Sequence, residues 1–208
     1  MRGLETGIEH IDKGFRGLKD GKLYCLFCLD EQERTNLIAQ TVMGLATRDN
    51  SVLLFSLEKD RRTMFQMLFD IYWQMCDADV QFDDIERRHL MLYKMGKLPI
   101  WIEDISELSY ASIQATIQRI CLLNKHAIEV IVVDNLSQMK TDFVVTSKEY
   151  AIMANLYLLK MVAKKQKIPV LLIGDGNSMP VINSNEYVDK VHNYESIEKT
   201  IVKIYYPN

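Results

Sequence analysis

The sequence has no long hydrophobic run and little net charge, and each of these shortages excludes a class of protein. No stretch approaches the roughly 18 uninterrupted apolar residues of a membrane-spanning helix, and residues 1–5 lack the apolar centre of a signal peptide. We therefore expect a cytoplasmic protein without a membrane partner. The formal net charge of −3 argues against a nucleic-acid coat protein, which needs clustered Lys and Arg to neutralise phosphates.

Cysteine is also scarce, and the four cysteines include one closely spaced pair, Cys25 and Cys28. Their C-x-x-C spacing is that of some redox and metal sites. No second pair and no histidine cluster accompanies it to complete a zinc site. Because both residues lie in the apolar run 23–29, we interpret them as small thiols in a buried strand.

The sequence has no internal repeat, no low-complexity tract and no linker rich in Pro and Gly, so we expect one domain over residues 1–208. Short apolar runs predict strands at 23–29, 51–57, 100–102, 129–133, 169–173 and 200–206. Helical spacing of apolar residues predicts helices at 33–46, 62–75, 109–124 and 148–167, and 77–97 is interpreted as helix plus loop. This alternation predicts an α/β fold with a largely parallel central sheet and helices on both faces.

In such sheets, ligands bind at the carboxyl ends of the strands, where the chain turns into a helix. The loops that follow Leu29, Leu57, Val133 and Ile173 are therefore the candidate site. Acidic residues stand at two of these positions, Glu58 and Asp134. Taken singly, an acid at a strand end is more often a capping or loop-forming residue than a catalytic one.

Taken together, these loops and their flanks resemble the ATPase domain of DnaB-type replicative DNA helicases, a RecA-like family. The matching segments occur in the family's order and at about its spacing, over nearly the whole chain. They are 6–12 (TGIEHID), 17–18 (GL), 21–23 (GKL), 56–58 (SLE), 98–104 (LPIWIED), 132–136 (VVDNL), 158–164 (LLKMVAK), 168–170 (IPV) and 195–198 (ESIE). The resemblance implies a RecA-like P-loop NTPase fold and Mg-ATP as cofactor.

The same resemblance assigns roles to individual residues. Glu58 corresponds to the catalytic glutamate that would polarise the attacking water. Asp134 corresponds to the Walker B aspartate, and Thr35 to the P-loop hydroxyl, so these two would hold Mg²⁺. A homo-oligomer is implied as well, because motors of this kind place each active site between subunits.

The phosphate-binding loop departs from the family pattern. A P-loop turns consecutive backbone N–H groups toward phosphate, glycines permit its close approach, and a lysine adds positive charge. In the equivalent segment, 28–35 (CLDEQERT), Glu33 replaces the glycine before the lysine and Arg34 replaces the lysine. The acids at 30, 31 and 33 would repel a triphosphate and can cap the helix that follows, so they disfavour nucleotide binding.

Two further parts of the family's site are altered. The segment 174–178 (GDGNS) replaces the family's glutamine-bearing sensor of the γ-phosphate. We find no clear match for the family's arginine finger and lysine pair, although Lys190 and Lys199 lie nearby in sequence. The segment 140–148, where the family has a DNA-contacting loop, has only Lys140 and Lys148 as cations, which gives DNA contact weak support.

Two functions remain open. The first is a non-hydrolysing RecA-like module that acts with replication or recombination proteins in DNA replication, recombination or a mobile element. The second is an active ATP-dependent DNA helicase or ATPase with a non-standard Walker A motif, in which Arg34 replaces lysine. A third, intermediate interpretation is that Mg-ATP binds without turnover. The acidic loop favours the first function.

Overall fold

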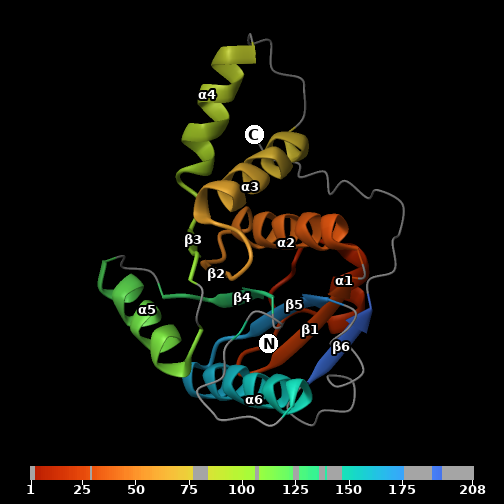
Figure 1. Cartoon of the computed structure of the whole chain (residues 1–208). Coiled ribbons are helices and arrows are strands. Elements are labelled where there is room, and N and C mark those ends of the chain that lie inside the picture. Colours follow the sequence, from red (N-terminus) through yellow and green to blue (C-terminus); the bar gives the residue numbers. More distant parts are fainter. Residues whose placement is uncertain are drawn as a thin grey trace.

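The computed structural model describes residues 3–28, 30–76, 84–105, 108–123, 127–135, 139, 147–175 and 189–193 (Figure 1). Its strands are β1 (Leu23–Cys28), β2 (Val52–Ser56), β3 (Ile100–Glu103), β4 (Val130–Asp134), β5 (Val170–Asp175) and β6 (Lys190–Asn193). They form one sheet in the order β3-β2-β4-β5-β1-β6, and every described pair of neighbouring strands is parallel. The predicted α/β class with a parallel central sheet is confirmed.

Helices cover both faces of this sheet (Figure 1). The helices are α1 (Glu9–Phe15), α2 (Glu31–Ala46), α3 (Arg61–Met75), α4 (Asp84–Met95), α5 (Tyr110–Leu123) and α6 (Lys148–Gln166). Side chains alternate along a strand, so each central strand contributes to two cores. Leu26 and Leu54 pack with α1 to α4 in one core, whereas Phe27 and Phe55 pack with α5 and α6 in the other.

Burial on both faces explains why these strands are uniformly apolar. Every residue of β1, β2 and β4 is buried. A strand that is covered on both sides has no solvent face on which polar residues could alternate. The sequence therefore predicted the location of these strands closely, with the observed ends within about two residues of the expected ones.

The structure also differs from the sequence-based expectations in a few elements. Helix α1 and the edge strand β6 were not predicted, because α1 has only 7 residues and β6 has 4, KVHN, with a single aliphatic side chain. The strand expected at 200–206 lies outside the described residues. Within the described part of the chain, no helix is long and apolar enough to span a membrane.

A partly buried ion cluster holds β6 against the rest of the domain. Asp189, just before β6, accepts hydrogen bonds from the backbone N–H of Leu23 at 2.8 Å and from Lys22 Nζ at 3.0 Å. Its carboxylate also pairs with Lys160 of α6, a lysine that is only 8% exposed. Burial acts to raise the pKa of Asp189, but these donors outweigh it and the pKa lies below its ordinary value.

The substitution Asp189→Asn tests this cluster. A carboxyl whose pKa is lowered in the folded state adds stability above its unfolded pKa, and this stability is lost as the pH falls through the folded pKa. We expect the variant to lose about 2 kcal/mol at pH 7, because Lys160 keeps its charge without its partner. Urea unfolding at pH 7, 4 and 3 should show the deficit decreasing at acidic pH. Asp20→Asn, in an exposed turn, is the control and should change little; an equal loss in both variants would contradict the account.

Candidate functional site

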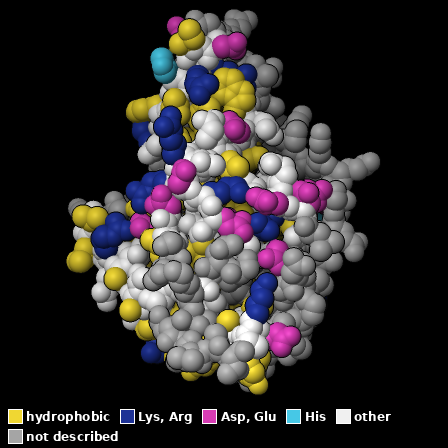
Figure 2. All heavy atoms as spheres, viewed as in Figure 1, with side chains coloured by type: hydrophobic (Ala, Val, Ile, Leu, Met, Phe, Trp, Pro, Cys, Tyr) yellow, Lys and Arg dark blue, Asp and Glu magenta, His cyan; other side chains and the backbone are white. Residues whose placement is uncertain are grey.

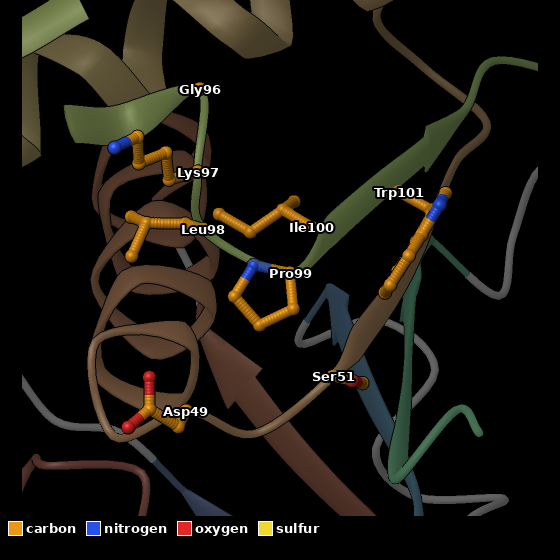
Figure 3. Close-up of a pocket in the computed structure, with 8 residues that line it drawn as sticks. All are labelled: Asp49, Ser51, Gly96, Lys97, Leu98, Pro99, Ile100 and Trp101. Atoms are coloured by element: carbon orange, nitrogen blue, oxygen red, sulfur yellow. The ribbon is translucent and has the colours of Figure 1, made fainter. Parts of the chain in front are cut away.

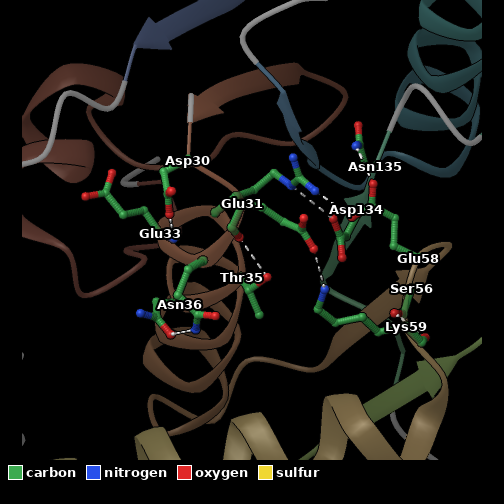
Figure 4. Close-up of polar contacts among 12 residues, drawn as sticks. Asp30, Glu31, Glu33, Thr35, Asn36, Ser56, Glu58, Lys59, Asp134 and Asn135 are labelled. Carbon is green, nitrogen blue, oxygen red and sulfur yellow. Dashed lines mark hydrogen bonds and ion pairs between the residues drawn. The ribbon is translucent and has the colours of Figure 1, made fainter.

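The parallel sheet brings the expected site residues to one edge. Ser56 at the end of β2 is in register with Asp134 at the end of β4, and Cys28 at the end of β1 is in register with Asp175 of β5. The carboxyl ends of these strands therefore face the first turn of α2. The residues around this edge form several groups of polar contacts, and Glu58, just beyond β2, belongs to the group that also holds Asp134 and Asn135 (Figure 4).

The connection between β1 and α2 is short. β1 ends at Cys28 and α2 begins at Glu31, so only two residues link them. The second of these, Asp30, is the N-cap of α2, and its side chain accepts a hydrogen bond from the Glu33 N–H at 2.8 Å. A carboxylate from the chain itself thus occupies a position where a helix N-terminus can bind an anion, as the sequence led us to expect.

Arg34 lies in the first turns of α2 and turns inward. Its side chain is only 7% exposed, and its Nη2 lies 2.5 Å from Oε2 of Glu58. Its Nε lies 3.9 Å from Oδ1 of Asp134, too far for a hydrogen bond. The cation at the expected phosphate-binding position is therefore paired with the two acids that the sequence analysis singled out.

Asn135 completes this group from the far side. Its Nδ2 donates a hydrogen bond of 2.9 Å to Oε1 of Glu58. Each carboxylate oxygen of Glu58 is therefore bound, one by Arg34 and the other by Asn135. Two donors from different elements hold the Glu58 side chain, which is 19% exposed.

Asp134 is the most deeply buried acid of the group, with 1% of its surface exposed. Burial raises its pKa to about 7, and the nearby carboxylate of Glu58 adds to the rise. Arg34 and Lys59 oppose the rise without cancelling it. Among the described residues, neither Oδ1 of Asp134 nor Nε of Arg34 has a hydrogen-bond partner. Asp134 therefore exchanges a proton near neutral pH.

Lys59 adds a second cation that the sequence analysis missed. Its Nζ lies 3.4 Å from Oε1 of Glu31, and its side chain is 16% exposed. The Ser56 hydroxyl donates to the Lys59 carbonyl at 2.7 Å, which ties the chain between Ser56 and Lys59 into a turn. The position of Lys59 directly after Glu58, and of Asn135 directly after Asp134, was the one available sign of their proximity.

Thr35 and Asp134 were expected to hold Mg²⁺, and in the structure each side chain contacts a different group of the protein. The Thr35 hydroxyl donates to the Glu31 carbonyl at 2.9 Å, within its own helix. Asp134 lies beside Arg34, with its Oδ1 3.9 Å from Arg34 Nε, and close enough to the Glu58 carboxylate for the two acids to repel each other. The described residues include no group of three or more His, Cys, Asp or Glu side chains that could hold a metal ion.

Of the other candidate residues, some lie in the described part of the chain and some lie outside it. Cys25 and Cys28 are free and buried, and burial raises the pKa of both thiols. Three residues apart on a strand, they point to opposite faces of the sheet, which agrees with their interpretation as packing residues. Residues 140–146, 176–178 and Lys199 lie outside the described part of the chain, as does the side chain of Lys190.

The chain has an α/β fold, and the candidate site lies at the carboxyl ends of its strands, where sheets of this kind commonly bind ligands. The family model of the DnaB-like helicase C-terminal domain matches residues 3–177. The chain therefore belongs to the DnaB-like helicase C-terminal domain family, and the resemblance stated from the sequence is confirmed at this level.

Two solved structures share the fold. A DnaB-like replicative helicase, described with its interactions with primase, superposes with a TM-score of 0.72 at 16% identity, covering 83% of this chain and 44% of that one. A second structure, described as an ATPase domain, gives the same TM-score and identity, covering 83% of this chain and 63% of that one. The chain thus spans less than two thirds of the length of either structure.

The raised pKa of Asp134 predicts a pH-dependent stability. A folded pKa above the unfolded value near 3.8 means that the stabilising protonated form is lost as the pH rises toward and through 7. Asp134→Asn should remove this dependence, because the amide stays neutral. The free energy of unfolding of the variant minus that of the native protein should therefore increase by about 1 to 4 kcal/mol when the pH is raised from 5 to 8.5.

Urea unfolding of both proteins at the two pH values measures this gain. Histidines and other carboxylates titrate in both proteins, so their contributions cancel in the comparison. A difference between variant and native protein that is the same at pH 5 and pH 8.5 would show that Asp134 has an ordinary pKa.

Proposed function

We propose that this domain is a non-hydrolysing member of its family, a RecA-like module that acts in DNA replication, recombination or a mobile element. Its site keeps the family's acids, Glu58 and Asp134, but fills the phosphate position with the protein's own ion pair. The observation that carries the proposal is the pairing of Arg34 with Glu58 at 2.5 Å.

The short β1–α2 connection supports this proposal. A P-loop cradles phosphate with successive backbone N–H groups of an extended, glycine-rich turn. Here residues 31–33, which would belong to that turn, are the first residues of helix α2, and only 29 and 30 remain outside it. One of the N–H groups, that of Glu33, is already bound to the Asp30 carboxylate. The backbone therefore offers little of the cradle that a triphosphate needs.

The charges of the site act in the same direction. A phosphate-binding lysine must have its charge available to the ligand, whereas the Arg34 guanidinium is bound to Glu58 and lies near Asp134. Breaking a buried ion pair leaves an uncompensated charge, which costs about 3 to 5 kcal/mol. A micromolar ligand provides about 8 kcal/mol in total, so this cost alone would remove much of the affinity.

Magnesium is not well accommodated either. The Thr35 hydroxyl donates a hydrogen bond within α2, and the Asp134 carboxylate lies 3.9 Å from the Arg34 cation. A magnesium site needs oxygen ligands in a near-octahedral arrangement, usually one or two carboxylates together with waters and substrate phosphates. The residues present do not fit Mg-ATP, and we derive no hydrolytic step from them.

The competing function is that of an active ATP-dependent helicase or ATPase with a non-standard Walker A motif. One observation favours it: Glu58 and Asp134 lie in the same cluster at the carboxyl edge, where hydrolysis would require them. In that case Arg34 would have to leave Glu58 and turn toward phosphate. Binding of Mg-ATP without turnover would be the intermediate outcome.

The partners follow by analogy. The DnaB-like replicative helicase with the same fold is described with its interactions with primase, and we propose that replication or recombination proteins also bind this chain.

We propose further that residues 1–208 form one domain and that it can assemble with copies of itself. On the face shown in Figure 2, acidic and basic side chains intermingle instead of gathering by sign, so DNA contact keeps weak support there.

Calorimetric titration with Mg-ATP and Mg-ADP tests the proposal. We expect no heat of binding up to about 1 mM nucleotide, because the cradle is short and Arg34 is already paired. Correct folding of the sample is checked by a cooperative thermal transition. Micromolar binding would refute the proposal, and turnover that disappears in Glu58→Gln would then identify an ATPase.

A double substitution separates the two causes of weak binding. Glu33→Gly with Arg34→Lys restores two residues of the family's motif without lengthening the connection. We expect this variant to remain unable to bind, because the first turn of α2 still replaces the loop. Binding by the variant alone would assign the defect to the side chains.

A further inference from the structure

Helix α4 has two apolar faces, one buried and one exposed. The helix lies beyond α3, at one end of the molecule (Figure 1). Met91 and Met95 pack in the core that α1 to α4 share, so this face is buried. The other apolar side chains are exposed, with Ile85 at 68%, Leu92 at 37% and Tyr93 at 63%. An amphipathic helix at the surface of a monomer needs one apolar face, so the second face of α4 requires an explanation.

The exposed residues of α4 form one continuous stripe. With about 3.6 residues in a helical turn, positions 85, 89, 92, 93 and 96 fall on the same side of the helix. They are Ile85, His89, Leu92, Tyr93 and Gly96, and all five are exposed. The N–H of Gly96 donates to the Leu92 carbonyl at 2.9 Å, so the helical turn continues as far as Gly96. The stripe is therefore about three turns long.

Contacts near both ends of α4 hold the helix in place. Near its beginning, the Arg87 guanidinium lies over the Trp73 ring of α3, 4.3 Å from the ring centroid. After its end, the segment 96–100 leads directly into β3 (Figure 3). The Pro99 carbonyl in this segment accepts the N–H of Val52 at 2.8 Å, which ties the segment to β2. The exposed stripe therefore lies on a helix whose position the rest of the domain fixes.

Charges of opposite sign flank the two ends of this stripe. Glu86 lies at the beginning of α4 and Lys97 just after its end, and both are exposed. They share the Tyr93 side of the stripe, because Glu86 precedes Tyr93 by about two helical turns and Lys97 Nζ lies 4.1 Å from the Tyr93 ring centroid. Arg88 flanks the other side, where its guanidinium lies over the Phe69 ring. One side of the stripe thus has an acid at one end and a base at the other.

The stripe is complementary in shape to a second copy of itself that runs in the opposite direction. In a two-fold symmetric pair, a residue i that meets residue j of the other copy has its own j met by that copy's i. An antiparallel pair can place Ile85 against Gly96, which has no side chain to obstruct it. The same register places His89 against Leu92. Large and small residues therefore alternate across the two helices.

The charges require the same register. In this antiparallel pair, Glu86 of each copy lies within about half a helical turn of Lys97 of the other, so two symmetric ion pairs form. A parallel pair would instead place Glu86 beside Glu86 and Lys97 beside Lys97, where like charges repel. Shape and charge thus select one arrangement, and its occupant is another copy of this chain.

We propose that two copies of the protein associate through α4, as an antiparallel and two-fold symmetric pair of helices. This inference rests on the self-assembly proposed above and is independent of nucleotide binding at the carboxyl edge. Two helices of this length bury less surface than a standard protein interface, so the dimer should be weak and dependent on concentration.

Analytical ultracentrifugation of the full chain, up to millimolar concentration, measures this association. We expect a monomer–dimer equilibrium. Ile85→Ser should weaken the dimer about ten-fold or more, because in a symmetric pair one substitution removes two apolar contacts. Leu122→Ser is the control: Leu122 is also apolar and 87% exposed, but it lies on α5, which packs on the other face of the sheet, so this variant should dimerise like the native protein.

Charge reversal tests the antiparallel register. Glu86→Lys and Lys97→Glu should each weaken the dimer about three- to ten-fold, since each variant brings like charges together at two symmetric positions. In an equimolar mixture of the two variants every lysine meets a glutamate, so the affinity should return to within about two-fold of the native value. Rescue by mixing excludes damage to the fold as the cause of the loss.

Three results would each overturn the proposal: a protein that stays monomeric at millimolar concentration, a dimer that Ile85→Ser leaves unchanged, or a mixture that associates no more tightly than its components. A dimer that persists in all the variants would place self-assembly on another surface. The nucleotide titration described above is unaffected by any of these results, so the two proposals fail separately.

Discussion

The ion pair between Arg34 and Glu58 constrains the whole carboxyl edge of the sheet. Arg34 comes from the first turns of α2 and Glu58 from the turn after β2, and both side chains are largely removed from water. A buried guanidinium has no neutral form in proteins, so it must find an acid in the fold. Once Arg34 pairs with Glu58, α2 is held close over the ends of β2 and β4, and the connection from β1 can remain at two residues.

The protonation of Asp134 brings the charges around this pair close to balance. Arg34 and Lys59 provide two positive charges against the carboxylates of Glu31, Glu58 and Asp134. Asp134 is the group whose protonation state differs from the usual one, since burial and Glu58 raise its pKa to about 7. With Asp134 protonated, the five groups are neutral in sum, which suits a site that stays folded without a charged ligand.

Much of the fold could be predicted from the sequence because its strands are buried on both faces. Continuous apolar runs such as 51–57 and 129–133 have no other simple explanation in a chain that alternates with helical segments. Helix α1 and strand β6 could not be predicted, because they are short and carry few apolar residues. The Asp189 cluster that holds β6 joins residues more than 160 positions apart, a pairing that no local pattern reveals.

The candidate site was predictable in composition but not in contacts. Parallel strands end at one edge, so Glu58, Asp134 and the α2 turn had to be neighbours. Whether Arg34 faces solvent, phosphate or an acid depends on rotamers and on the length of the β1–α2 connection, which sequence spacing does not determine. The contributions of Lys59 and Asn135 became visible only with the folded chain, although both directly follow residues that the sequence had already singled out.

A double-mutant cycle with Arg34→Met and Glu58→Gln measures most directly the coupling energy between Arg34 and Glu58. The pair Arg119 and Glu103 has the same 2.5 Å separation and differs in its exposed arginine, since Arg119 is 52% and Glu103 15% exposed; it provides the matched cycle with Arg119→Met and Glu103→Gln. Urea unfolding at pH 7 should give a coupling energy of about 2 kcal/mol or more for the pair with the buried arginine and below about 1 kcal/mol for the pair with the exposed arginine. Equal, small coupling in both cycles would show that Arg34 is free to serve a ligand, and would contradict the account.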